Sequence, residues 1–166
     1  MEKIGFGGGC HWCTEAVFQT LKGVEIVEQG WIASEGVHDD FSEAVIVHFD
    51  ESEIDLTTLT AIHLYTHSCT SEHSMRKKYR SAVYTFSNMY AEKVKAIIEQ
   101  LQSEFDKPIV TQVLPFVSFK ENKEQYQNYY LKNSENQFCK TYINPKFSLL
   151  MQRFSKQVDR NKLKHV

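Results

Sequence analysis

The segment Gly7-Gly8-Gly9-Cys10-His11-Trp12-Cys13 places a cysteine where a glycine-rich turn runs into a stretch of helical spacing. A thiol at the start of a helix lies beside unpaired backbone N–H groups and at the positive end of the helix dipole, and both favour the thiolate. The glycines allow a tight turn and leave room for a ligand. These features predict that Cys10 is a nucleophilic thiolate in a thiol-dependent enzyme, with a buried structural cysteine as the alternative.

The other cysteines extend this prediction towards redox chemistry. The chain holds four of them, Cys10, Cys13, Cys69 and Cys139. In a small secreted protein this number would indicate a disulfide framework, whereas in a cytosolic chain it indicates redox catalysis or metal binding. Cys13 follows Cys10 by one helical turn, as in the Cys-x-x-Cys pairs of thiol–disulfide oxidoreductases.

A metal site is a weaker alternative. The segment from His63 to His73 carries ligand types for zinc or iron at helical or near-helical spacing, and Cys10, His11 and Cys13 could join them. The ligand types in that segment are His63, His67, Cys69 and His73. Histidines at the end of a helix are more often structural, and the chain has no pair of Cys-x-x-Cys motifs, so we expect no metal.

The composition narrows the class of protein. A chain of 166 residues is large enough to bury a core without disulfides, and we expect one domain over residues 1–166. Its net charge of −2 gives no basis for a nucleic-acid surface. No apolar run approaches the roughly 20 residues of a membrane helix, and the start at Met1 lacks a signal-peptide pattern. We expect a cytoplasmic monomer whose basic tail, which includes Lys164 and His165, is a solvated end.

Hydrophobic periodicity predicts the elements that must position these residues. The predicted strands are Lys3–Gly8, Val24–Ile32, Ala44–Phe49, Arg80–Phe86 and Ile109–Leu114. The predicted helices are Cys10–Lys22, one capped by Asp55 and ending near Thr66, one capped by Ser87 or Asn88 and ending near Phe105, Glu121–Leu131 and Pro145–Val158. This order contains a split βαβ arrangement, which predicts an α+β, two-layer sandwich with a ferredoxin-like core and additional C-terminal helices.

Several separated motifs resemble, in register, the A-type peptide methionine sulfoxide reductases, which act on the S epimer of the sulfoxide. They span roughly residues 3–155 and are Gly9-Cys10-His11-Trp12, Ser42-Glu43-Ala44-Val45, Tyr79-Arg80-Ser81-Ala82-Val83-Tyr84, Pro115 with Phe119, Tyr126-Gln127-Asn128-Tyr129-Tyr130-Leu131, Phe138-Cys139 and Ile143-Asn144-Pro145-Lys146. Three departures stand out. His11 replaces a phenylalanine, the loop Ser34–Phe41 is short and lacks a substrate-facing tyrosine, and Ser74, beside His73, replaces an aspartate.

The resemblance implies reduction of methionine-S-sulfoxide, peptide-bound or free, to methionine. Cys10 would attack the sulfur and become a sulfenic acid. Glu43 would protonate the oxygen, with a pKa that we expect burial to raise, and Tyr79 would donate a hydrogen bond to the same oxygen. Trp12 would form the wall of a pocket for the methyl group. The alternatives are a solvated Glu43, a half-buried sheet tyrosine at Tyr79 and a core tryptophan at Trp12.

His11 takes the substrate-binding place of the phenylalanine, and two roles stay open for it. The ring could pack as phenylalanine does, or it could donate a proton or stabilise the Cys10 thiolate.

The sulfenic acid must then be resolved by a second thiol, which gives a disulfide for thioredoxin or a similar dithiol to reduce, with no cofactor. We expect Cys139, in a polar and mobile tail where the family often places this cysteine, to resolve it first, with Cys13 close behind. Cys69 is expected to be structural. The competing interpretations are a general thiol–disulfide oxidoreductase using Cys10 and Cys13, and a derivative that binds without turnover.

Overall fold

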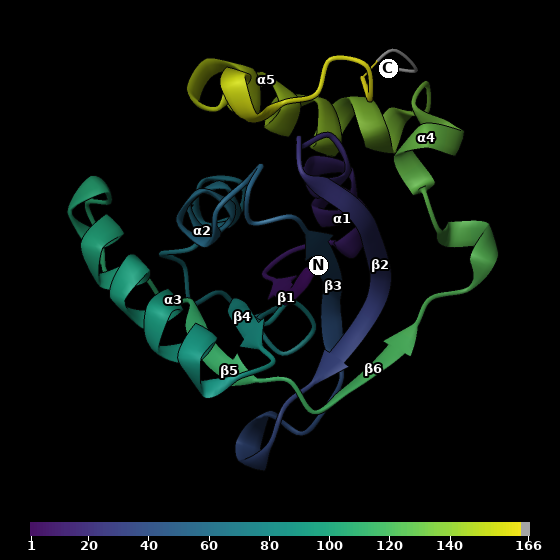
Figure 1. Ribbon diagram of the computed structural model, residues 1–166. Coiled ribbons are helices and arrows are strands. Elements are labelled where there is room, and N and C mark those ends of the chain that lie inside the picture. The colour runs from purple at the N-terminus through teal and green to yellow at the C-terminus, as the bar shows by residue number, and fades with distance from the viewer. Residues whose placement is uncertain (164–166) are drawn as a thin grey trace.

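A six-stranded sheet of order β5-β4-β1-β3-β2-β6 forms the centre of the computed structural model (Figure 1). The strands are β1 (Glu2–Gly7), β2 (Val24–Ala33), β3 (Ser42–Phe49), β4 (Ala82–Thr85), β5 (Gln112–Pro115) and β6 (Ser118–Glu121). The pair β4–β5 is parallel and the other neighbours are antiparallel. The structure describes residues 1–163, so Lys164 and His165 of the expected solvated tail lie outside the described residues.

The predicted ferredoxin-like core is confirmed. The strands β4-β1-β3-β2 lie side by side and are connected through α1 (His11–Gln19) and α2 (Leu56–Tyr65), which is the split βαβ arrangement. A third helix, α3 (Asn88–Leu101), connects β4 to its parallel neighbour β5, as a parallel crossover requires. Both predicted caps are present, since Asp55 accepts the Thr58 N–H at 2.7 Å and Ser87 accepts the Tyr90 N–H at 3.2 Å.

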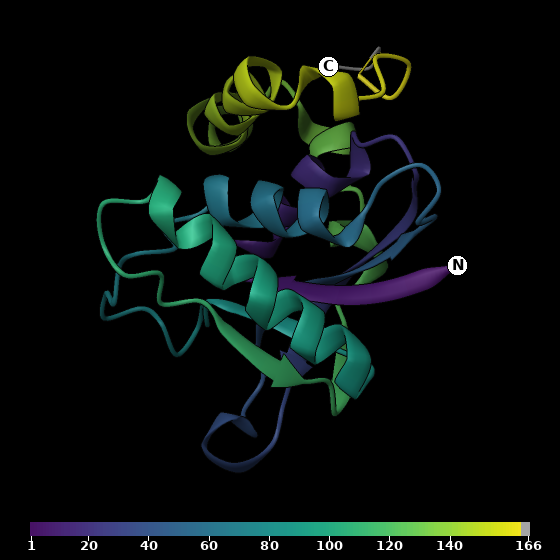
Figure 2. The ribbon, with the colours of Figure 1, turned by 60° about the vertical axis from the view of Figure 1, so that its left-hand side comes forward.

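The two faces of the sheet bury different clusters because side chains alternate along each strand. On β3, Val45, Val47 and Phe49 face the main core, which they share with the helices. Figure 2 shows α2 and α3 covering this face. Ala44 and Ile46 face the opposite side, where they form a smaller cluster with residues of β2 and β4.

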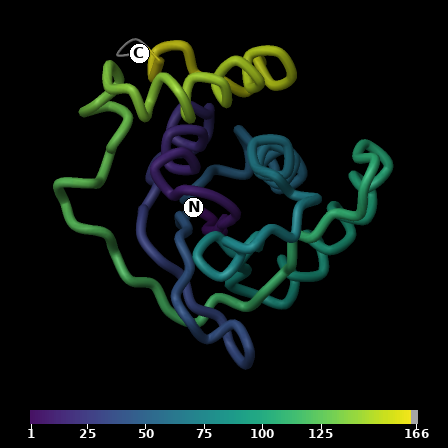
Figure 3. Tube along the Cα trace, turned by 180° about the vertical axis from the view of Figure 1, so that it is seen from behind, coloured from purple at the N-terminus to yellow at the C-terminus, as the bar shows by residue number. Residues whose placement is uncertain are grey.

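The sheet curls because its two edge strands follow one another in the chain. Only Phe116 and Val117 separate β5 from β6, although these strands lie at opposite ends of the strand order. Figure 3 shows the chain passing round the sheet from β5 towards the C-terminal helices. Phe116 and Phe119 pack against the smaller cluster, which the curl encloses.

The predicted helix Glu121–Leu131 is wrong. The segment instead ends β6, makes a single 3-10 turn at Glu124–Tyr126 and begins α4 (Tyr129–Asn133). Pairing of Lys120 with Trp31 of β2 extends the chain at this point, and Asn128 has a φ of 55°, which a right-handed helix cannot contain. The segment therefore forms a strap between the sheet and the C-terminal helices.

The last helix is shorter than the predicted Pro145–Val158. A π-helical turn, Cys139–Ile143, leads into α5 (Asn144–Arg153), with Pro145 in the first turn as expected. Within residues 1–163, no helix has the length and hydropathy that a membrane crossing needs.

Candidate active site

Cys10 lies at the N-cap position of α1, where its carbonyl accepts the N–H groups of Cys13 at 3.1 Å and Thr14 at 3.2 Å. The residue is half-buried. The pKa of Cys10 is lowered, mainly by a hydrogen bond from the Cys13 thiol and also by the backbone N–H groups of Trp12 and Cys13. Burial and the charge of Glu43 oppose this effect. The N–H groups of Trp12 and Cys13 are the helix-start donors expected from the sequence, but the Cys13 thiol has the larger effect on the pKa of Cys10.

The glycine turn before Cys10 is held in place by contacts with a segment distant in the sequence. Gly8 has a φ of 154°, and a Cβ at this position would lie 2.4 Å from Cδ2 of His67. Arg76 Nη1 donates to the Gly8 carbonyl and to the Tyr79 carbonyl, each at 3.0 Å. The same guanidinium therefore holds the nucleophile's turn against the segment that carries Tyr79.

Glu43 lies at the start of β3 and is 6% exposed, so the expectation that it is buried is met. Its Oε1 accepts the backbone N–H of His11 at 3.2 Å, which places the carboxyl group beside the Cys10–His11 peptide. Its Oε2 lies 3.7 Å from Lys78 Nζ. The structure thus brings together the two side chains that the sequence analysis assigned as nucleophile and acid.

Tyr79 is half-buried and adjoins this pair through Lys78. The Lys78 ammonium lies 5.0 Å from the centre of the Tyr79 ring and 3.7 Å from Glu43 Oε2. Sequence reasoning did not single out Arg76 or Lys78. Their only signal was the run of basic residues directly before Tyr79.

His11 is buried, with 5% exposure, and its ring is fixed at both nitrogens. Nδ1 lies 2.7 Å from the Gly30 carbonyl, and Nε2 lies 3.4 Å from Glu43 Oε1 and 3.5 Å from Asn122 Nδ2. Burial is the main cause that lowers the pKa of His11, so the neutral ring is favoured. The close approach of β6 here requires Gly30, since a Cβ would lie 2.1 Å from the Lys120 carbonyl oxygen.

Trp12 belongs to an aromatic cluster. Its ring stacks on Tyr129 with centroids 3.9 Å apart and an interplanar angle of 5°, and Phe138 meets it edge-on at 5.3 Å. Its Nε1 is buried and has no hydrogen-bond partner in the part of the chain that the structure describes. A cavity of about 340 Å³ adjoins the cluster, lined by His11, Trp12, Trp31, Lys120, Glu121, Asn122, Lys123 and Tyr126.

Glu15 positions this cluster, a role that sequence reasoning missed. The carboxyl group is fully buried and accepts the N–H groups of Asn128 at 2.9 Å and Tyr129 at 3.0 Å. Burial raises the pKa of Glu15, against these two hydrogen bonds. A signal was present, because Glu15 and Trp12 are three residues apart and share one face of the helix.

The expectation that Cys139 lies in a mobile polar tail is wrong. Cys139 is 0% exposed in the π-helical turn, where its N–H donates to Asn136 Oδ1 at 2.9 Å. Cys13 is also buried, and its pKa is raised, first by the hydrogen bond with Cys10 and then by burial. The amphipathic helix α5 covers this region, so the tail forms part of the core.

Lys146 of α5 is a further residue that sequence reasoning did not single out. Its ammonium donates to the Thr66 carbonyl. Burial lowers the pKa of Lys146, while the charges of Cys13 and Cys10 raise it. A cation therefore lies near both thiols, and its only signal was its place in the Asn144-Pro145-Lys146 motif.

The histidines of the possible metal site have protein partners. His63 Nε2 lies 2.8 Å from the Gly7 carbonyl, and His67 Nε2 lies 2.8 Å from Ser81 Oγ. Cys69 is buried, and burial raises its pKa to about 11. Among residues 1–163, no three His, Cys, Asp or Glu side chains are arranged to hold a metal ion.

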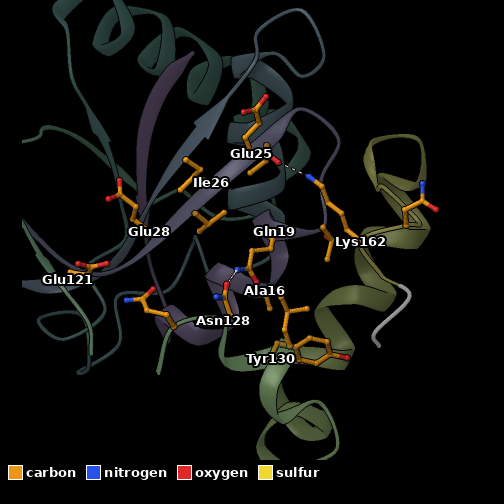
Figure 4. A pocket seen from close by; sticks show the side chains of 15 residues that line it. Ala16, Gln19, Glu25, Ile26, Glu28, Glu121, Asn128, Tyr130 and Lys162 are labelled. Atoms are coloured by element: carbon orange, nitrogen blue, oxygen red, sulfur yellow. Dashed lines mark hydrogen bonds between the residues drawn. The ribbon is translucent and has the colours of Figure 1, made fainter. Parts of the chain in front are cut away.

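A cavity of about 610 Å³ has no cysteine in its lining (Figure 4). Side chains of α1, β2 and the start of α4 surround it, including Gln19, Glu25, Ile26 and Asn128. Gln19 and Asn128 close one side through a hydrogen bond of 2.6 Å. Its size alone therefore does not mark the reactive site.

Comparisons with known proteins agree with this geometry. Residues 2–159 match the family described as "Peptide methionine sulfoxide reductase". The chain is 34% identical to the peptide methionine sulfoxide reductase MsrA of Chromobacterium violaceum, over 93% of this chain and 97% of that protein.

Two solved structures are similar in fold. The reduced form of Mxr1 from Saccharomyces cerevisiae has a TM-score of 0.75 at 23% identity, covering 85% of this chain and 90% of that one. Mxr1 in complex with Trx2 has a TM-score of 0.61 at 22% identity, covering 77% and 84%.

Proposed function

Because the chain belongs to the peptide methionine sulfoxide reductase family, we propose that it reduces methionine-S-sulfoxide with Cys10 as the nucleophile and Glu43 as the acid. The observation that carries this assignment is the pairing of a half-buried thiol, whose pKa is lowered at a helix start, with a buried carboxyl group beside the same peptide. A thiolate and a proton source are the two groups that sulfoxide reduction needs.

The reaction follows from these two groups. The Cys10 thiolate attacks the sulfoxide, the sulfur–oxygen bond of the substrate breaks, and the oxygen is transferred to the Cys10 sulfur. Glu43 delivers the proton that this oxygen takes up, and the products are the thioether of methionine and a sulfenic acid on Cys10. The substrate sulfur is reduced by two electrons and the Cys10 sulfur is oxidised by two. Tyr79 donates a hydrogen bond to the same oxygen.

Trp12 binds the methyl end of the substrate in this proposal. One face of its ring is covered by Tyr129, so the substrate meets the remaining ring surface towards the adjoining cavity. His11 lines the same cavity and contributes to binding there.

Cys13 is the better placed of the two candidate resolving thiols. Its thiol already donates to the Cys10 sulfur, and residues one turn apart on a helix lie at about 5–6 Å between Cβ atoms. Attack of Cys13 on the sulfenic acid forms a Cys10–Cys13 disulfide and releases water. Cys139 is buried near Cys13, and we rank it second as the resolving thiol. This ranking reverses the order expected from the sequence.

Thioredoxin reduces the resulting disulfide in this scheme. Mxr1, which shares the fold, is known in complex with Trx2. We further propose that residues 1–166 act as one domain in the cytoplasm, since a cycle through free thiols needs a reducing compartment. Cell fractionation with an antibody to the chain tests the location.

The test of the activity is turnover with each epimer. We expect the reduced protein, with dithiothreitol or thioredoxin and its reductase, to consume methionine-S-sulfoxide and leave the R epimer, as measured by chiral chromatography of a dabsyl-labelled substrate. A peptide and the free amino acid are assayed in parallel. Consumption of neither epimer by folded protein would leave binding without turnover, or general disulfide exchange, as the function.

The resolving thiol is identified by a single turnover without reductant. We expect one equivalent of S-sulfoxide to produce a Cys10–Cys13 disulfide, mapped by mass spectrometry after alkylation. Cys139→Ser should form the same disulfide, and Cys13→Ser should leave a Cys10 sulfenic acid that dimedone traps. A Cys10–Cys139 disulfide in the wild type, with Cys13 alkylated, would restore the order expected from the sequence.

A further inference from the structure

A chain of hydrogen bonds with a fixed direction runs through the interior to the His11 ring. Gln29 Nε2 donates to the Tyr126 carbonyl at 2.9 Å, so Gln29 Oε1 is left to accept from Asn122 Nδ2 at 2.6 Å. Asn122 Oδ1 accepts the Lys123 N–H at 2.9 Å, which fixes the orientation of this amide as well. The Asn122 amide therefore presents a donor, and not an acceptor, to His11 Nε2.

The other end of the ring meets an acceptor. His11 Nδ1 lies 2.7 Å from the Gly30 carbonyl oxygen, and a carbonyl can only accept, so Nδ1 carries a hydrogen. With a donor facing Nε2 and an acceptor facing Nδ1, the resting ring is neutral and has its lone pair on Nε2. Burial lowers the pKa of His11, in agreement with this state.

His11 Nε2 lies 3.4 Å from Glu43 Oε1 and 3.5 Å from Asn122 Nδ2, so its one lone pair can accept a hydrogen bond from either group. The lone pairs of Nε2 and Oε1, both buried, repel each other unless a proton lies between them. We propose that His11 is a positioning residue that keeps a proton on Glu43, so that the pair stores the proton that Cys10 loses when it becomes a thiolate. This inference rests on the proposed function and deepens its acid step.

The stored proton completes the balance of the first half-reaction. A sulfoxide and a thiol give a thioether and a sulfenic acid, so a thiolate needs one proton from elsewhere in the site. The pair supplies it, and the proton ends on the oxygen of the Cys10 sulfenic acid. Without the Nε2 acceptor, the hydrogen bond that holds this proton between the two side chains is lost.

The charged groups around His11 act on the same proton. Glu43 belongs to β3 and Lys78 to the segment before β4. Cys10 directly precedes His11 in the chain. Gly30 and Trp31 of β2 are uncharged, and Trp31 meets the His11 ring edge-on at 5.1 Å. Lys120, Glu121 and Lys123 also line the cavity beside the ring. Among residues 1–163, only Glu43 lies within ion-pair distance of the His11 ring, at 3.4 Å from Nε2, and can share a proton with it directly.

The test compares pH profiles of kcat/KM for the wild type, His11→Phe and His11→Gln with methionine-S-sulfoxide. Phenylalanine keeps the ring volume, and glutamine keeps a polar group without one that titrates near neutral pH. We expect the alkaline limb of the kcat/KM profile of both variants to lie about 1 pH unit or more below that of the wild type. Activity at lower pH should be retained. His48→Gln is the matched control, because His48 Nε2 lies 2.7 Å from Glu28 Oε2 in a second His–Glu pair remote from Cys10, and its profile should not move.

A second readout does not depend on turnover. Imidazole ¹⁵N NMR of the reduced wild type at neutral pH should show His11 neutral with the hydrogen on Nδ1. An Nε2–H tautomer or an imidazolium would overturn the inference, as would alkaline limbs of both variants that superimpose on the wild type. If the wild type consumes no S-sulfoxide, the proposed function fails, and the NMR spectrum still tests the His11 tautomer on which the pairing rests.

Discussion

Replacing Cys10 by serine is expected to lower turnover of methionine-S-sulfoxide by at least about 1,000-fold while the fold is retained. Serine has nearly the same volume, but its hydroxyl does not ionise near neutral pH, so the N–H groups at the start of α1 have no anion to stabilise. The measurement is steady-state consumption of the S epimer with dithiothreitol, together with circular dichroism and thermal unfolding to show that the variant is folded.

Cys69→Ala provides the matched control for this result. Cys69 is a buried cysteine of the same chain, in the segment after α2. Its loss should leave turnover within about twofold of the wild type, provided that the small cavity does not unfold the protein. Turnover by Cys10→Ser at a rate comparable with that of Cys69→Ala would remove Cys10 from the mechanism.

The core of the fold was accessible to sequence reasoning because its signals are local. β1 to β4 have clear apolar patterns, and the helices α2 and α3 begin at side chains that cap them, Asp55 and Ser87. The ferredoxin-like order followed from the split βαβ arrangement of these elements. β6 had no such signal, because a strand of four residues at a sheet edge is defined by its distant partner, residues Gly30 to Ala33 of β2.

The C-terminal third shows why helical spacing alone misled. The segment 121–131 carries tyrosines at spacings typical of a helix, but Glu15 binds the N–H groups of Asn128 and Tyr129 and fixes a break there. The same kind of long-range contact hides Cys139, which a polar neighbourhood in the sequence made look mobile. In both places, tertiary hydrogen bonding and burial override the local pattern.

The reacting residues of the site could be predicted from the sequence, but the residues that hold them in place could not. Cys10 and Glu43 each belong to a motif, and the structure places them beside the same peptide. The partners of His11, by contrast, lie 19 residues away at Gly30 and 111 residues away at Asn122. No sequence periodicity links such positions, so the sequence left the role of His11 open, and the contacts of the ring come from the structure.

The second large effect is expected for Glu43→Gln, which should lower kcat for the S epimer by about 100- to 10,000-fold. Glutamine keeps the shape of the side chain and an oxygen that accepts the His11 N–H, so the strand and the turn should be preserved. It cannot deliver a proton to the sulfoxide oxygen. Glu28→Gln, which alters the glutamate paired with His48, is the control and should retain the wild-type kcat.

A separate measurement distinguishes loss of the acid from damage to the nucleophile. At a pH where Glu43 is ionised, its charge raises the pKa of Cys10, and the uncharged glutamine favours the thiolate. Alkylation of Cys10 by iodoacetamide needs only the thiolate, and it should therefore proceed in Glu43→Gln at least as fast as in the wild type, and faster at alkaline pH, while turnover falls. Misfolding would slow turnover without favouring the thiolate in this way. A Glu43→Gln protein that keeps the wild-type kcat would show that another group protonates the oxygen.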